Sequence, residues 1–229
     1  MRFSSITTFA LACATGIQAQ FTWERLDKTK AVVVIVDIQE GLRSVVRDFD
    51  PVTYRNAILA HAEFSNMFNL PLLITTASEN GANGPLVPEF LDLVPNATVV
   101  PRAGEINALD NPDFVAALEA TGKKQVILAG ILTDVCTTFL SLSLKEAGYS
   151  VWANVEASGT TSELIRDVSN DMMRAAGVNV VSFLHIFSDL MRSWANTPGF
   201  VELMPYLDKY YPVYGTVARL FNAASNATA

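Results

Sequence analysis

Three side chains that can do chemistry, an aspartate, an arginine and a cysteine, each come shortly after an apolar run. Asp37 directly follows the first run, Arg102 comes two residues after another, and Cys136 comes seven residues after a third. If the runs are parallel strands, their carboxyl ends meet at one edge of a sheet, where side chains from separate strands can assemble. The spacing therefore predicts a candidate catalytic site made of Asp37, Arg102 and Cys136.

Each residue type has a physical role in such a site. A thiol near the amino end of a helix feels the helix dipole and nearby amide donors, and a neighbouring arginine lowers its pKa further, so we expect Cys136 to favour the nucleophilic thiolate. An aspartate within hydrogen-bond reach can take the thiol proton and later activate water. Backbone N–H groups in the turn before the helix can hold a developing oxyanion. The combination predicts nucleophilic catalysis.

The same residues also have ordinary structural explanations. A lone cysteine is by default a small core side chain, an acid at a strand end is often a helix cap, and an arginine is most often a surface charge. Only the shared location of Asp37, Arg102 and Cys136 favours a catalytic role over these explanations.

The elements that must position these residues follow from the pattern of apolar runs and helix signals. Continuous β-branched runs are typical of strands that are covered on both faces. The predicted strands are 31–36, 72–76, 98–100, 125–129, 150–154 and 179–183. The predicted helices, marked by capping residues, prolines and terminal glycines, are 51–69, 113–120, 135–147 and 163–176. This alternation predicts a three-layer α/β/α fold with a six-stranded, mainly parallel, doubly wound (Rossmann-like) sheet.

A segment rich in turn-forming residues, 78–88, follows the second predicted strand. Open α/β sheets bind ligands beyond the carboxyl ends of their strands. We therefore expect 78–88 to form one wall of the pocket.

The amino terminus has the pattern of a secretory leader. The first nineteen residues contain Arg2, an apolar stretch at 6–17 and the small residue Ala19. The stretch is shorter than the roughly 20 residues that a spanning helix needs. We therefore predict a signal peptide at 1–19, a single domain at 20–229 that includes the C-terminal tail, and secretion; an N-terminal helix or a membrane anchor is the alternative.

Removal of the leader has consequences for cysteine and for modification. Cys13 would be lost, which leaves Cys136 as the one cysteine of the mature chain and no internal disulfide. Asn96 and Asn226 each begin an Asn-Ala-Thr sequence, the acceptor pattern for N-glycosylation in an exported eukaryotic protein.

Composition limits the classes of partner. The chain has 229 residues, 50% of them hydrophobic, and a formal net charge of −7 without a Lys/Arg cluster. Such a chain forms a globular core and lacks the basic surface of a nucleic-acid binder. We expect a small-molecule substrate, with no nucleic-acid partner and no membrane contact after leader removal.

Several longer motifs make the chain similar to the isochorismatase-like cysteine hydrolases, in particular the YcaC-like branch. The resemblance extends over roughly residues 26–194. The segments that carry it are Asp37-Ile38-Gln39, NGPLVPE at 83–89, GEINALDNPDF at 104–114, ATGKKQ at 120–125, GILTDVC at 130–136 and ASGT at 157–160.

The resemblance implies a catalytic triad and a reaction class. Asp37 would be the general base, Arg102 the basic member and Cys136 the nucleophile of a metal-independent hydrolase that needs no cofactor and cleaves a small amide-like C–N bond through a thioester. It also implies oxyanion or substrate contacts from Leu132, Thr133 and Gln39, with the amide of Cys136 sharing the oxyanion.

Two further implications concern the backbone and the assembly. The family tends to have a non-proline cis peptide before the threonine of the motif, which falls at Ile131-Leu132 in this chain. The family usually forms homo-oligomers; the aromatic stretch 198–212 could serve as an oligomer contact, although packing of a tail is the simpler explanation.

Departures from the branch leave the substrate open. Ile38 stands where histidine is common, and Thr137 stands where valine is common. The two histidines, His61 and His185, do not have the spacing of metal ligands, so no metal is expected. Two alternatives remain: a secreted non-catalytic binding or interaction protein on the same fold, and a protein with a redox-reactive thiol.

Overall fold

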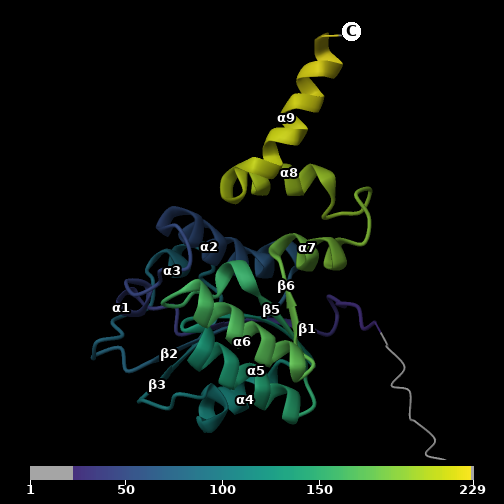
Figure 1. Ribbon diagram of the computed structural model, residues 1–229. Coiled ribbons are helices and arrows are strands. Elements are labelled where there is room, and N and C mark those ends of the chain that lie inside the picture. Colours follow the sequence, from purple (N-terminus) through teal and green to yellow (C-terminus); the bar gives the residue numbers. More distant parts are fainter. Residues whose placement is uncertain (1–22, 228–229) are drawn as a thin grey trace, which may run out of the picture.

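Six apolar segments form one parallel sheet in the computed structural model, which describes residues 23–227 (Figure 1). The strands are β1 (Ala31–Val36), β2 (Leu72–Ala77), β3 (Thr98–Arg102), β4 (Gln125–Gly130), β5 (Ser150–Asn154) and β6 (Asn179–Val181). Their order in the sheet is β3-β2-β1-β4-β5-β6, and all neighbours are parallel. The sequence prediction of a doubly wound sheet is confirmed.

Helices cover both faces of this sheet. They are α1 (Glu40–Arg43), α2 (Pro51–Phe68), α3 (Glu89–Leu93), α4 (Pro112–Ala120), α5 (Thr138–Glu146), α6 (Glu163–Ala175), α7 (Phe183–Met191), α8 (Phe200–Tyr210) and α9 (Pro212–Ala227). Shorter turns are η1 (Ala108–Asp110), η2 (Thr133–Thr137) and η3 (Val155–Ala157). One core lies between the sheet and α2, α7 and α8, and the other lies between the sheet and α4, α5 and α6 (Figure 1).

Strand β1 shows why the central strands are apolar throughout. Ala31, Val33 and Ile35 belong to the first core, and the alternate residues Val32 and Val34 belong to the second. Successive strand side chains point to opposite faces, so a strand between two helical layers needs apolar residues at every position.

Several element ends shift by one or two residues, among them that of β3, which extends to Arg102, and two boundaries are corrected for a clear physical reason. The predicted strand 179–183 ends at Val181, because the Ser182 side chain accepts a hydrogen bond from the backbone of His185 and caps α7. The predicted helix 135–147 begins as an α-helix only at Thr138, because η2 before it is a wider π-helical turn. Local periodicity does not distinguish a π turn from an α turn, since both place apolar residues toward the same layer.

The C-terminal aromatics divide between core and surface. Tyr206 and Tyr210 of α8 are buried, and Tyr206 stacks on Phe183 with ring centroids 5.3 Å apart. Phe200 is 41% exposed. Packing thus explains part of the aromatic stretch 198–212, while α9 beyond it projects from the body of the domain (Figure 1).

The predicted signal peptide lies outside the described residues, and the predicted glycosylation sites lie in or near exposed segments. The signal peptide at 1–19 and Cys13 lie outside the described residues. Asn96 lies in an exposed turn before β3, and Asn226 lies near the end of α9, whose last side chains are outside the described part. Within residues 23–227, no helix is long and apolar enough to span a membrane.

A buried histidine connects the sheet to α2 and makes stability depend on pH. His61 lies within hydrogen-bond distance of the Val34 carbonyl, 3.3 Å from Nε2, and of the Asn154 amide, 3.2 Å from Nδ1. Burial lowers the pKa of His61 to about 4, because the interior disfavours the charged ring.

We expect acid to destabilise the fold through His61. Between pH 6.5 and 4 the unfolded chain binds a proton at this position and the folded chain does not, so the free energy of unfolding falls as pH falls. The loss is about 2 kcal/mol between pH 7 and pH 5. Urea titrations across this range should show that His61→Gln has a flatter pH dependence than the parent. His185→Gln, at an exposed position of α7, is the matched control and should keep the parent's slope; equal slopes for all three proteins would contradict the assignment.

Candidate active site

Strand order brings the three predicted residues to one edge of the sheet. β1 lies beside β4, and the chain moves outward from this pair in opposite directions, which is the switch point where open α/β sheets bind ligands. Asp37 directly follows β1, η2 with Cys136 follows β4, and Arg102 ends β3. Asp37 and Arg102 are 65 residues apart in the chain, and Arg102 and Cys136 are 34 apart, yet all three lie at the carboxyl edge of the sheet.

Asp37 is held in an unusual backbone conformation and is fully buried. Its φ is 56°, in the left-handed region that aspartate and asparagine tolerate better than most residues, and its backbone N–H donates to the Thr75 carbonyl at 2.9 Å. One carboxylate oxygen, Oδ1, pairs with the Arg102 guanidinium. The other, Oδ2, is buried and completes no hydrogen bond among the described residues. Asp37 therefore has one oxygen fixed and one available.

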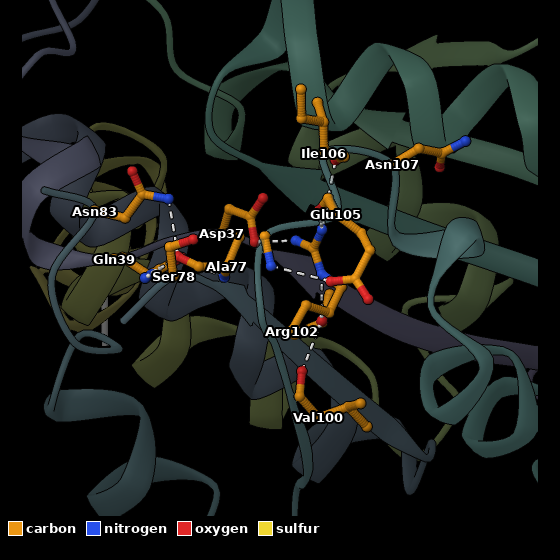
Figure 2. A network of polar contacts seen from close by, with 12 residues as sticks. Asp37, Gln39, Ala77, Ser78, Asn83, Val100, Arg102, Glu105, Ile106 and Asn107 are labelled. Atoms are coloured by element: carbon orange, nitrogen blue, oxygen red, sulfur yellow. Dashed lines mark hydrogen bonds and ion pairs between the residues drawn. The ribbon is translucent and has the colours of Figure 1, made fainter. Parts of the chain in front are cut away.

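Arg102 is held by acceptors at all three of its guanidinium nitrogens (Figure 2). Its Nε donates to the Thr75 hydroxyl at 3.0 Å, one terminal nitrogen donates to the Glu105 carbonyl, and the other donates to Asp37. Thr75 in turn donates to the Val100 carbonyl at 2.7 Å. Because the ion pair is buried, removal of either partner would leave an uncompensated charge. The guanidinium is thus a fixed positive charge beside the Asp37 carboxylate.

Cys136 is partly exposed and lies in η2, beside the Asp37 carboxylate. Burial and the negative charge of Asp37 raise the pKa of the thiol; Arg102 and a backbone hydrogen bond from Leu132 act in the opposite direction but do not offset this. Burial also raises the pKa of Asp37, against the opposing effects of Arg102 and the thiol. The pKa of the Cys136 thiol is therefore raised, not lowered as expected from the helix dipole and Arg102, and the Asp37 carboxylate lies next to it.

The turn before Cys136 depends on close backbone approach. A side chain at Gly130 would place its Cβ 2.3 Å from Cγ1 of Val36 and 2.8 Å from the Thr137 hydroxyl. The Ile131-Leu132 peptide is cis, as the resemblance implied. Gly130 thus allows η2 to lie directly against β1, which carries Asp37.

Leu132 and Thr133 differ in the availability of their amides. The Leu132 backbone forms a hydrogen bond to the Cys136 sulfur. The Leu132 amide would therefore lie next to a substrate that is bonded to this sulfur. The Thr133 N–H donates to the Gly159 carbonyl at 3.1 Å and is not available as an oxyanion donor. The Thr133 hydroxyl is buried without a partner among the described residues. The Thr133 backbone amide is thus occupied, and the predicted substrate contact of Thr133 stays a prediction that only its side chain could fulfil.

Gln39 holds the loop that follows β2 (Figure 2). Its side-chain nitrogen donates to the carbonyls of Ala77, at 3.0 Å, and Gly84, at 2.5 Å, and its oxygen accepts from the Ala77 N–H at 2.8 Å. Asn83 also donates to the Ala77 carbonyl, at 2.8 Å. These bonds fix the loop 78–88 next to the site and give Gln39 a structural role; its predicted substrate contact stays a prediction.

Sequence reasoning missed the residues that support Arg102. Thr75 and Thr76 are the polar residues of the buried strand β2, and a buried hydroxyl usually has a hydrogen-bond partner, which is a signal in the sequence for a contact of this kind. Glu105 accepts from the Gly104 N–H at 3.1 Å and from Asn111 at 3.0 Å, and these bonds lower its pKa to about 2. Conversely, Ile38 is fully buried in the first core, so this departure from the branch does not face the site.

We expect Thr75→Val to loosen Arg102 and to change the pH profile. The variant removes the acceptor for Nε and the donor to Val100, at a cost of about 1–3 kcal/mol in stability. A less firmly held guanidinium stabilises ionised Asp37 less, so the acid limb of thiol alkylation against pH should move to higher pH.

Thr76→Val is the matched control for this prediction. The Thr76 hydroxyl is equally buried and has no hydrogen-bond partner among the described residues. This variant should keep the parent's profile and lose no stability. Equal profiles for Thr75→Val and the parent would show that Thr75 does not position Arg102.

Comparison with known proteins agrees with this fold and identifies the family. The Isochorismatase domain family model matches residues 31–183. The chain belongs to the isochorismatase family. "Probable hydrolase YcaC" of Escherichia coli is 45% identical over 172 residues, which are 75% of this chain and 83% of that protein. The protein is thus an isochorismatase-like hydrolase.

Two solved structures of this family have the same architecture. YcaC from Pseudomonas aeruginosa, described with hexane-2,5-diol and covalent acrylamide, is 43% identical with a TM-score of 0.84, over 88% of this chain and 99% of that one. The YcaC gene product of Escherichia coli, described as an octameric hydrolase of unknown specificity, is 40% identical with a TM-score of 0.84, over 89% and 99%. The family similarity therefore extends beyond the matched domain to most of the described chain.

Proposed function

We propose that this chain is a cysteine-dependent hydrolase that cleaves a C–N bond of a small amide-like substrate through a thioester. The observation that carries the proposal is the arrangement around Asp37: one carboxylate oxygen is paired with Arg102, the other is buried without a hydrogen-bond partner among the described residues, and the Cys136 thiol lies beside this carboxylate. This is the arrangement of a nucleophile with its general base and an orienting third group.

In the first half of the reaction, the Cys136 sulfur attacks the substrate carbonyl carbon while Asp37 takes the thiol proton. The carbonyl oxygen becomes an oxyanion, for which the backbone amides of Leu132 and Cys136 are the proposed donors. When the oxyanion collapses, Asp37 returns the proton to the leaving nitrogen, the C–N bond breaks, and the amine departs from the thioester.

In the second half, water attacks the thioester carbon and gives a proton to Asp37. Collapse of this second oxyanion breaks the C–S bond, and Asp37 returns the proton to the sulfur, which releases the carboxylic acid and restores the thiol. Arg102 remains paired with Asp37 and limits how far burial raises the carboxyl pKa, so the base is ionised when the thiol proton must be removed.

The high pKa of Cys136 favours this function over a redox role. Thiols that sense oxidants are accessible and ionise readily. The raised pKa of the partly exposed Cys136 thiol instead means that a base must take its proton at the moment of attack. The covalent acrylamide named for the Pseudomonas aeruginosa relative indicates a reactive nucleophile in that protein.

The test is to trap the acyl intermediate. A panel of small primary and secondary amides would be mixed with the protein and quenched in acid, and intact mass would be measured. We expect one acyl group per chain, which peptide mapping places on Cys136, with release of the amine. Complete labelling of Cys136 by acrylamide, but no acyl adduct and no turnover with any amide, would favour the non-catalytic binding protein.

We also propose that the protein is a homo-oligomer. The Escherichia coli relative, which is 40% identical over nearly its whole length, is described as octameric. Multi-angle light scattering of the purified chain is the direct measurement, and a monomeric mass at all concentrations would overturn this.

We further propose that the chain is exported and loses residues 1–19. N-terminal sequencing of the protein from its native source should begin at Gln20. If export passes through a glycosylating compartment, glycosidase treatment should reduce the mass of peptides that contain Asn96, which is exposed. An intact Met1 on the native protein would contradict this proposal.

A further inference from the structure

The C-terminal helix α9 leaves the domain with an apolar face that nothing in the described chain covers. Figure 1 shows α9 projecting from the body, next to α8. Val213, Val217 and Leu220 are 80%, 69% and 66% exposed. They are spaced by four and three residues, which places them along one side of a helix in the pattern of a helix–helix seam.

The direction of α9 is fixed by contacts to α8. A side chain at Gly215 would place its Cβ 2.0 Å from Oδ1 of Asp208, so the two helices approach closely at this glycine. Arg219 of α9 forms an ion pair with the same Asp208. The projection is therefore a defined structure, and the exposed seam is presented at a set angle to α8.

A helix of this kind needs a partner. α9 has 16 residues, and helices near this length are only marginally stable in water without tertiary packing. Its contacts to α8 at Gly215 and Arg219 lie in its first eight residues, and Val217 and Leu220 stay exposed beside them. Three large exposed apolar side chains in a row exceed the scattered exposure that is normal for a surface.

A complementary surface lies directly beside α9 on the same chain. A hollow of about 530 Å³ between α7, α8 and α9 is lined by apolar and aromatic side chains, including Trp194, Phe200, Met204 and Val217. Val217 therefore belongs both to the seam and to the wall of the hollow. A second copy of the chain that brings its own α9 into this hollow would offer its hollow to the first, which is the self-complementary geometry of a two-fold interface.

Charge also favours a second copy over a membrane surface. The chain has a net charge of −7, but α9 contains no acidic residue, so α9 itself brings no negative charge toward a second copy. Its one basic residue, Arg219, is paired with Asp208. Helices that lie on membranes carry several Lys or Arg residues on the polar face, and α9 does not.

We propose that α9 and the hollow between α7, α8 and α9 form a two-fold interface with a second copy of this chain. The inference rests on the proposed homo-oligomer and names the surface that makes it. The seam of Val213, Val217 and Leu220 packs against the partner's hollow, and both surfaces become buried.

The first test measures assembly of the full chain by light scattering across a dilution series. We expect Val217→Lys/Leu220→Lys to raise the dissociation constant for this interface at least about tenfold, so that the variant has a smaller mass at the same concentration. Val52→Lys is the matched control, because Val52 is a 67% exposed valine at the start of α2, and it should assemble as the parent does.

The second test needs no variant and applies even if the double variant misfolds. Hydrogen exchange in the parent should show protection of the α9 amides at high concentration and loss of this protection on dilution, with unchanged protection of the strands. An α9 that exchanges freely within the assembled protein would overturn the proposal.

The outcomes separate this surface from the broader proposals. A monomeric parent overturns both the oligomer and the interface, whereas an oligomeric parent with an unaffected double variant overturns the interface alone. Binding of the monomeric parent to phosphatidylcholine–phosphatidylserine vesicles, with α9 protected only there, would assign α9 to membranes instead. Alkylation of Cys136, followed in the same samples, reports the active site independently.

Discussion

Cys136→Ala should lose amide hydrolysis by about 10⁴-fold or more, because removal of a catalytic nucleophile leaves only substrate binding and oxyanion stabilisation. Acyl-adduct formation should disappear with turnover. Steady-state kinetics on any amide that the parent hydrolyses, together with intact mass, checks both expectations. The fold should be retained, because Cys136 is partly exposed and the change removes a single sulfur atom.

Ser141→Ala is the matched control for loss of the nucleophile. Ser141 is buried in α5, close in sequence to Cys136, and its hydroxyl has no hydrogen-bond partner among the described residues. It should keep the parent's turnover. A Cys136→Ala protein that hydrolyses amides at the parent's rate would show that the thiol is not the nucleophile.

Asp37→Asn should lower turnover by about 10²–10⁴-fold and should also make the thiol easier to ionise. These two effects have opposite signs for reactivity. The variant removes the base that accepts the proton, so acylation slows. It also removes the negative charge that helps to raise the Cys136 pKa and leaves Arg102 without its counter-charge, so the midpoint of iodoacetamide labelling against pH should move down.

Asparagine is the informative replacement at this position. It is close to aspartate in size and tolerates the φ of 56° at residue 37. Asp189→Asn is the matched control, because Asp189 is also a buried aspartate paired with an arginine, Arg192. It should lose stability without a change in the labelling midpoint. A labelling midpoint for Asp37→Asn that stays in place or moves up would exclude Asp37 as the group that controls the thiol.

The pH dependence of the parent follows from the same two groups. Burial raises the pKa of both Asp37 and Cys136. Hydrolysis requires an ionised Asp37 carboxylate, so the rate should rise with pH as Asp37 loses its proton. Hydrolysis also requires the Cys136 thiol to carry a proton that Asp37 can take. Because the pKa of this thiol is raised, the rate should stay high above the pH range in which ordinary thiols ionise.

The fold could be predicted from the sequence because its signals are local. The β-branched runs, the caps Asp50 and Asn111, and the prolines that follow them determine where strands and helices begin, and each of these depends on a few neighbouring residues. The boundary errors arose where a local pattern allows two geometries. The π turn at η2 and the cap at Ser182 are decided by packing and hydrogen bonds that a periodicity does not contain.

The residue types of the site could also be predicted, but their state could not. Sequence places Asp37, Arg102 and Cys136 after strands, and strand order then brings them together. The pKa of Cys136 depends on how deeply the thiol is buried and how close it lies to Asp37. Both effects raise this pKa, whereas the helix dipole was expected to lower it. The occupied amides of Gln39 and Thr133 likewise depend on carbonyls of Gly84 and of Gly159, distant in sequence.

The sequence by itself determined the doubly wound sheet, the family and the three residue types at one edge, because hydrophobic period, capping and motif spacing are properties of short segments. The tertiary structure alone decided which carboxylate oxygen of Asp37 is free, that Thr75 holds Arg102, and that α9 stands apart with an open apolar face. These features depend on distances between segments far apart in the chain, and such distances arise only when the layers pack.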